Sequence, residues 1–127
     1  MIVRLVGSEM CIRDRYWGYI TTVFATDDFT LKEVFMKAGT QSSMEYHVRK
    51  DEYYYIQSGK LKVGMRIGRA KNKSLILEKG DVFHIPPGLM HMRIALEDTI
   101  VIEWSNKDDD TDSNIVEDGK TYTFIED

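Results

Sequence analysis

Short segments with β-type side chains, separated by turns that contain glycine or proline, recur along almost the whole of this sequence. We expect strands at residues 17–25, 29–36, 43–48, 52–57, 61–65, 74–77, 82–85, 90–95 and 99–104, and an edge strand at 121–125. No stretch of useful length shows helical periodicity. Many short strands at regular spacing are typical of a β-sandwich or a barrel, so the sequence predicts an all-β fold.

The first fifteen residues are predicted not to belong to the natural protein. Residues 5–14 match, without a break, one reading frame of a common transposon-based sequencing adapter. The alternative is a genuine N-terminal strand at residues 2–6. Translated adapter is left out of fold reasoning, so we divide the chain into an artefactual segment, residues 1–15, and a single domain, residues 16–127. Upstream natural sequence is then expected to be missing, and Cys11 carries no information about the redox environment.

Charge and composition argue against several classes of function. The chain carries 17 Lys and Arg against 21 Asp and Glu, a net charge of −4, so we expect neither a nucleic-acid nor an anionic-membrane partner. No apolar run approaches the length of a membrane span, and no secretory signal is recognisable, which together favour a cytoplasmic location. Because no cysteine follows Cys11, a disulfide framework and a thiol nucleophile are excluded.

Four side chains with nitrogen and oxygen donors are the strongest functional signal. Side chains alternate along a strand with a period of two, so Glu45 and His47 are expected to face the same way. Glu52 can face them from the next strand, and His91 comes from a distant hairpin. Mixed imidazole and carboxylate donors suit a first-row divalent metal ion, so Glu45, His47, Glu52 and His91 are the predicted ligands.

The segments that carry these residues resemble the two signature motifs of the cupin family. They read Gly39-x5-Glu45-x-His47-x4-Glu52-x6-Gly59 and Gly80-x5-Pro86-x-Gly88-x2-His91. The resemblance covers nearly all of residues 16–125 and implies a double-stranded β-helix, the cupin jelly-roll barrel, with a divalent metal ion (Zn, Mn or Fe) in its mouth. Two fixed positions differ, because Glu45 replaces the first histidine of the first motif and Ala95 the final asparagine of the second.

Within that family the sequence is most similar to the C-terminal isomerase domain of type II mannose-6-phosphate isomerases. The matching stretches include Trp17-Gly18-Tyr19, Ser43-Met44-Glu45-Tyr46-His47, Ile102-Glu103-Trp104 and Ile115-Val116-Glu117-Asp118. The resemblance implies a metal-dependent isomerase of a sugar or sugar phosphate. The arginine that those isomerases carry directly after the second-motif histidine is replaced by Met92, with Arg93 one position later.

Catalytic roles are predicted for Glu45 and Arg93, each with an alternative. Glu45 is expected to be a fourth ligand, a general base beside the metal, or an ion-pair partner of Arg93. Arg93 shares strand parity with His91, so it is expected either to clamp a phosphate or carboxylate or to pair with Glu45 or Glu103.

Other features are assigned more ordinary roles, and other functions stay open. His84 is expected at the rim of the site or behind the ligands, and the run Asp108–Asp112 is expected to be a solvated acidic loop. A non-catalytic sugar-binding or regulatory cupin and an iron-dependent oxygenase are the alternative functions. Strand faces that carry Tyr53 and Tyr55 also allow a homodimer, which is one of the arrangements expected.

Overall fold

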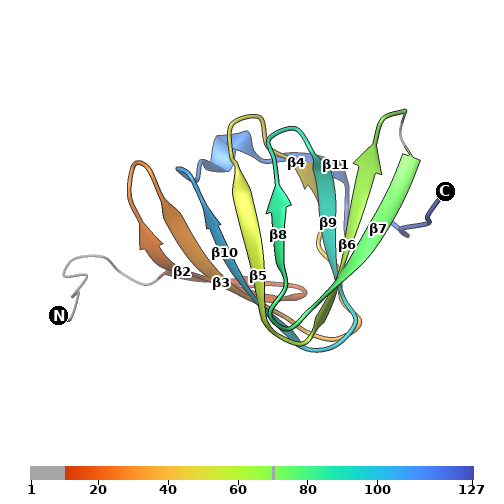
Figure 1. Cartoon of the computed structure of the whole chain (residues 1–127), viewed down its shortest axis with the longest axis horizontal. Helices are drawn as coiled ribbons and strands as arrows, with labels where there is room; N and C mark the ends of the chain where they lie inside the picture. Colours follow the sequence, from red (N-terminus) through yellow and green to blue (C-terminus); the bar gives the residue numbers. More distant parts are fainter. Residues whose placement is uncertain (1–10, 70) are drawn as a thin grey trace.

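The computed structural model describes residues 11–69 and 71–127 and confirms the predicted all-β fold, a jelly roll (Figure 1). The strands are β1 (Cys11–Arg15), β2 (Gly18–Ala25), β3 (Thr30–Met36), β4 (Met44–Tyr46), β5 (Glu52–Ser58), β6 (Lys60–Ile67), β7 (Lys71–Glu78), β8 (Val82–Ile85), β9 (Met90–Ala95), β10 (Thr99–Ser105) and β11 (Asn114–Glu117). One antiparallel sheet has the order β1-β2-β3-β10-β5-β8 and the other β11-β4-β9-β6-β7. Within the described ranges, no helix has the length and apolar content that crossing a membrane requires.

Inward-facing side chains of both sheets form one apolar core. Burial alternates along β10, where Val101 is fully buried and its neighbours Ile100 and Ile102 are only partly covered. Burying one large aliphatic side chain contributes roughly 1.5–3 kcal/mol relative to leaving it exposed, so this core holds the strands in place. Its largest members include Val34, Met36, Tyr54, Ile56, Leu61, Val63 and Val101.

Strand register gathers polar groups in the interior beside this core. Glu103 of β10 lies opposite Lys32 of β3 on one side and Tyr54 of β5 on the other. In the second sheet, Glu45 of β4 lies opposite His91 of β9. The predicted ligands therefore come from the interior of the barrel and not from its outer surface.

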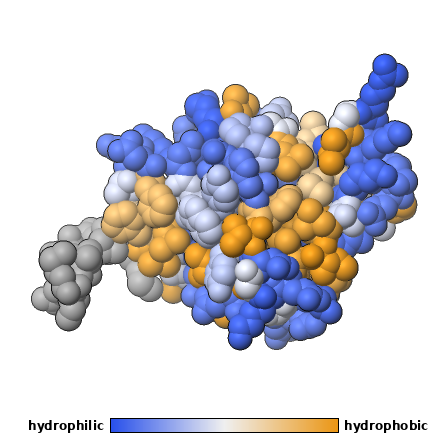
Figure 2. Space-filling view, viewed as in Figure 1, coloured by the Kyte–Doolittle hydropathy of each residue, from blue (hydrophilic) through white to orange (hydrophobic). Residues whose placement is uncertain are grey.

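The outer face of the first sheet carries stacked aromatic rings. The ring of Tyr53 stacks on His84 with centroids 4.4 Å apart and on Trp104 at 5.5 Å. Figure 2 shows apolar residues in patches across the middle of the molecule, with hydrophilic residues toward the ends of the strands. His84 is exposed on this outer face, contacts Asp51 and does not line the cavity beside the predicted ligands, so the expectation that it lies at the rim of the site or behind the ligands is wrong. The homodimer expected through this face stays a prediction.

The N-terminal segment is an edge strand in the structure. β1 pairs antiparallel with β2, and all five of its residues are exposed. Residues 1–10, including the alternative strand at 2–6, lie outside the described residues. The division of the chain at residue 15 therefore stays a prediction.

The predicted edge strand at 121–125 is wrong, because the last strand is β11 at Asn114–Glu117. Residues after β11 are held through side chains instead of a ladder. The Tyr122 hydroxyl accepts hydrogen bonds from Arg66 and Asn72, and Phe124 packs against Gly64. The alternating aromatic residues that suggested a strand therefore cover the outer side of β6.

The turn between β5 and β6 requires glycine at position 59. Gly59 has φ of 90°, and a Cβ there would overlap the backbone of Asp98 and Thr99, whereas Gly39, with φ of 81°, has no described atom within 4 Å of such a Cβ. We expect Gly39→Ala to lower the free energy of unfolding by about 1–2 kcal/mol, the strain of a left-handed L-residue, and Gly59→Ala to lower it clearly more. Urea unfolding measures both variants, and equal losses would contradict the overlap.

Candidate metal centre

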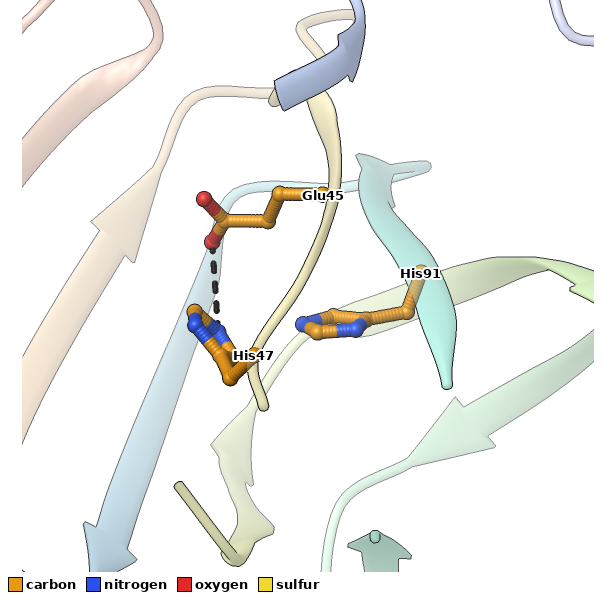
Figure 3. A group of neighbouring side chains, drawn as sticks. All are labelled: Glu45, His47 and His91. Carbon is orange, nitrogen blue, oxygen red and sulfur yellow. Dashed lines mark ion pairs between the residues drawn. The ribbon is translucent and has the colours of Figure 1, made fainter. Parts of the chain in front are cut away.

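Three of the four predicted ligands meet at one point. Glu45 lies in β4, His47 follows two residues later, and His91 lies opposite Glu45 in β9. One donor atom of each residue lies within 4.8 Å of the others. Figure 3 shows the carboxylate and the two imidazoles directed into a shared space. Both histidines are buried, so this space lies inside the barrel.

Glu52, at the start of β5, adds a second carboxylate. Its Oε1 is 3.1 Å from Nε2 of His91 and 3.8 Å from Nε2 of His47, and its Oε2 is 3.1 Å from Nζ of Lys50. Burial raises the pKa of this carboxyl, but the hydrogen bond from His91 and the charge of Lys50 outweigh burial and hold the pKa well below its usual range. Glu52 is therefore an anion although it is only 1% exposed.

Both imidazoles are held in one tautomer by backbone carbonyl groups. Nδ1 of His47 is 3.0 Å from the carbonyl oxygen of Asp112, and Nδ1 of His91 is 2.8 Å from that of Leu89. A carbonyl oxygen can only accept, so each Nδ1 carries a proton and donates it. When His91 is protonated, its Nε2 donates to Glu52. In the neutral rings that a metal ion would bind, the lone pair of each Nε2 faces the carboxylates, an arrangement typical of histidine ligands.

The donor group fits a divalent cation. Burial lowers the pKa of His91, but the adjacent Glu52 carboxylate raises it more, so a proton can bridge those two residues. Nε2 of His47 is buried and has no hydrogen-bond partner among the described residues. A buried polar atom without a partner is unfavourable, and a cation between the two imidazoles and the two carboxylates would remove that deficit.

Asp112 connects the acidic segment to the loop that carries His47. Its carboxylate accepts hydrogen bonds from the backbone N–H groups of Val48, Arg49 and Lys50 at 2.7, 2.9 and 3.0 Å. Burial raises the pKa of this carboxyl, but the three N–H donors outweigh burial and hold the pKa below its usual range. The expected solvated loop at Asp108–Asp112 is therefore wrong for Asp112, which is 3% exposed because a short 3-10 turn directs it inward.

Arg93 reaches the interior, as its strand parity predicted. Nη1 is 3.1 Å from Oε2 of Glu103, and the guanidinium carbon lies 5.0 Å from the ring centroid of Trp17 and 5.9 Å from that of Tyr54. The structure thus shows the pairing with Glu103, one of the two alternatives. A catalytic role for Arg93 stays a prediction.

Lys50 is a site residue that sequence reasoning missed. Besides Glu52, its Nζ lies 3.1 Å from Oδ1 of Asp108, whose other oxygen binds Lys32. Burial lowers the pKa of Lys50, but the surrounding carboxylates, Glu52 first, raise it above its ordinary value. Its separation of two residues from Glu52 was visible in the sequence, but it lies between the strands expected at 43–48 and 52–57, so no shared direction was inferred.

A cavity of about 460 Å³ opens beside the donor group. Glu45, His47 and Glu52 line it together with Lys50 and Arg93, and β1 forms part of one side. Cavities of roughly 300–1,000 Å³ hold small-molecule ligands, so this one is large enough for a small molecule next to the donors. All the candidate site residues lie in residues 16–127.

Loss of the Asp112 carboxylate should destabilise the protein. Asp112→Ala leaves three backbone N–H groups without their acceptor, so we expect the free energy of unfolding at pH 7 to fall by about 2–3 kcal/mol. The pKa of Asp112 is lower in the folded protein than in the unfolded chain. The stabilisation by its carboxylate is therefore complete at pH values above the unfolded-state pKa and is lost as the pH falls through the folded-state pKa. Denaturant unfolding should show a smaller difference in the free energy of unfolding between Asp112→Ala and wild type below about pH 4 than at pH 7. Asp110→Ala, with a side chain 78% exposed, is the control, and an equal effect of both would contradict this role.

Similar folds occur in several solved structures. The capsular polysaccharide assembling protein CapF from Staphylococcus aureus is 23% identical with a TM-score of 0.76, over 87% of this chain and 33% of CapF. KdgF from Halomonas sp. is 25% identical with a TM-score of 0.69, over 80% of this chain and 91% of KdgF. Oxalate decarboxylase from Bacillus subtilis is 18% identical with a TM-score of 0.73, over 85% of this chain and 30% of that chain. This chain therefore spans about a third of CapF and of oxalate decarboxylase.

The family assignment comes from the sequence match. No curated protein matches the chain. None of the three structures above is titled a mannose-6-phosphate isomerase, so that closer resemblance stays a prediction. The family described as Cupin matches residues 24–123, well over half of the 127 residues. The chain belongs to the cupin family.

Proposed function

We propose that this cupin binds a divalent metal ion through His47, Glu52 and His91, with Glu45 either as the fourth ligand or as a general base beside the metal, and acts on a small carbohydrate-type ligand in the adjoining cavity. The observation that carries the proposal is the buried Nε2 of His47, which has no hydrogen-bond partner within residues 11–69 and 71–127 and faces a second imidazole and two carboxylates. The mixed donor set is compatible with Zn, Mn or Fe. When bound, such an ion supplies Lewis-acid polarisation of a ligand carbonyl or hydroxyl.

The specific reaction we propose is isomerisation of a sugar or sugar phosphate, of the mannose-6-phosphate isomerase type. An aldose–ketose exchange requires one group that removes a proton from a carbon and returns it to the adjacent carbon. Glu45 suits this task because its carboxylate lines the cavity, while the Ser113 hydroxyl donates to Oε2 and orients it. A carbohydrate ligand is supported by the similar fold of CapF, a capsular polysaccharide assembling protein.

A non-catalytic sugar-binding cupin is the second candidate. It is favoured by the position after His91, where the isomerases carry arginine and this chain has the fully buried Met92. Arg93, the nearest replacement, is paired with Glu103. This candidate predicts ligand binding without turnover. An iron-dependent oxygenase ranks lower, because a second carboxylate would occupy a coordination position in the site that such enzymes keep open.

Removing both imidazoles should abolish metal binding. We expect wild-type protein to hold roughly one divalent ion per chain after dialysis, and His47→Ala/His91→Ala protein to hold almost none, because two of four donors are lost. Elemental analysis of both proteins measures the ratio. His84→Ala, which changes an exposed histidine on the outer face, should keep the wild-type content. Full metal content in the double variant would contradict the site.

Glu45→Gln should distinguish a base from a ligand. If Glu45 moves the proton, turnover falls by about 10²–10⁴-fold while the metal content is retained, because an amide cannot accept the proton. A parallel loss of metal would assign Glu45 as a ligand instead. The assay follows interconversion of aldose and ketose hexose phosphates by the metal-loaded protein, with Ser113→Ala as a milder variant that keeps the carboxylate. Unchanged turnover and metal content would rule out both roles.

A further inference from the structure

The ammonium group of Lys50 has more donors than its ion pairs use. Nζ lies 3.1 Å from Oε2 of Glu52 and 3.1 Å from Oδ1 of Asp108. A lysine ammonium has three N–H donors and no acceptor. The side chain is 11% exposed and lines the cavity. The ammonium thus forms ion pairs with two carboxylates, and with three N–H donors it has at least one left for a molecule in the cavity.

The same two carboxylates fix the position of this flexible side chain. Asp108 is itself held from its other oxygen by Lys32, so it cannot turn away from Lys50 without losing that contact. A lysine normally loses considerable conformational freedom when it binds a ligand. For Lys50 that loss is already incurred in the folded protein, which makes the ammonium group a preorganised donor.

Glu52 relates Lys50 to the proposed metal site, on which this inference rests. One carboxylate oxygen faces the two imidazoles and the other faces Lys50. Glu52 can thus offer one oxygen to a cation while the ammonium holds the other. With a divalent ion in place, the three negative charges of Glu45, Glu52 and Asp108 are matched by the ion and Lys50, and Lys32, which also binds Asp108, adds a further positive charge. A ligand anion then enters a region without excess negative charge.

We propose that Lys50 contacts the ligand and donates its third N–H to an anionic oxygen, such as a carboxylate or an enediolate, while holding Glu52 as a one-oxygen metal ligand. The role of recognising negative charge, predicted for Arg93, falls to Lys50. Arg93 also has an unused donor, because its buried Nε has no hydrogen-bond partner among the described residues, but its guanidinium is paired with Glu103 and flanked by Trp17 and Tyr54.

Metal affinity and anion affinity should respond differently to the loss of Lys50. The full chain is loaded with Co²⁺, whose affinity is measured by competition with a chromophoric chelator, and is then titrated with oxalate, followed by the Co²⁺ absorbance. For Lys50→Met we expect Co²⁺ affinity to be unchanged or higher, because a positive charge leaves the site. Oxalate affinity should fall by about tenfold or more, because a charge-assisted hydrogen bond is lost.

Control variants separate this role from a structural one. Lys60→Met removes a lysine that also pairs with two carboxylates, Glu78 and Glu97, but does not line the cavity, so both affinities should stay close to wild type. Lys50→Arg should keep most of the oxalate affinity, and Lys50→Gln should lose it. If Lys50→Met does not fold, these two variants are compared in its place.

Four results would overturn the inference or its basis. Unchanged oxalate affinity in Lys50→Met would remove the contact. A joint fall of Co²⁺ and oxalate affinity would show that Lys50 only maintains the structure. Wild-type protein that binds Co²⁺ but not oxalate would remove the anion site alone. Wild-type protein that does not bind Co²⁺ would instead overturn the proposed metal site.

Discussion

A buried carboxylate, Glu52, organises the interior of this barrel. An anion with almost no exposure is tolerated only when positive or donor groups surround it. Here Lys50 contacts one oxygen, and the imidazoles of His91 and His47 face the other. Glu52 comes from β5 of one sheet, His91 from β9 of the other, and His47 and Lys50 from the loop between β4 and β5, so the jelly roll positions them together only when both sheets are formed.

The surroundings of the donors are as specific as the donors themselves. Backbone carbonyl groups of Asp112 and Leu89 set the imidazole tautomers, and Ser113 orients Glu45. The Asp112 carboxylate also fixes the loop between His47 and Lys50. Contacts of this kind reduce the rearrangement needed when a cation binds, because the lone pairs already converge. The acidic segment is therefore part of the site's framework and not a solvated appendage.

The sequence predicted what depends on local periodicity. Alternation between residues 17 and 104 indicated each strand found there, and spacing brought Glu45, His47, Glu52 and His91 together. Contacts between distant segments were not predictable, because Asp112 lies 62–64 positions from the amides it binds and no pattern links them. The strand expected at 121–125 failed for a related reason. Its aromatic residues alternate because they cover the outer side of β6. In a single sequence that pattern looks the same as the pattern of a strand that pairs with a neighbour.

The central claim is that two imidazoles and carboxylate oxygens bind one cation. X-ray absorption spectroscopy of the zinc-loaded wild-type chain tests it directly. The account predicts a first shell of nitrogen and oxygen at about 2.0–2.2 Å, with outer-shell scattering from two imidazole rings and no sulfur. A shell without imidazole scattering, or one that contains sulfur from Cys11, would contradict the account.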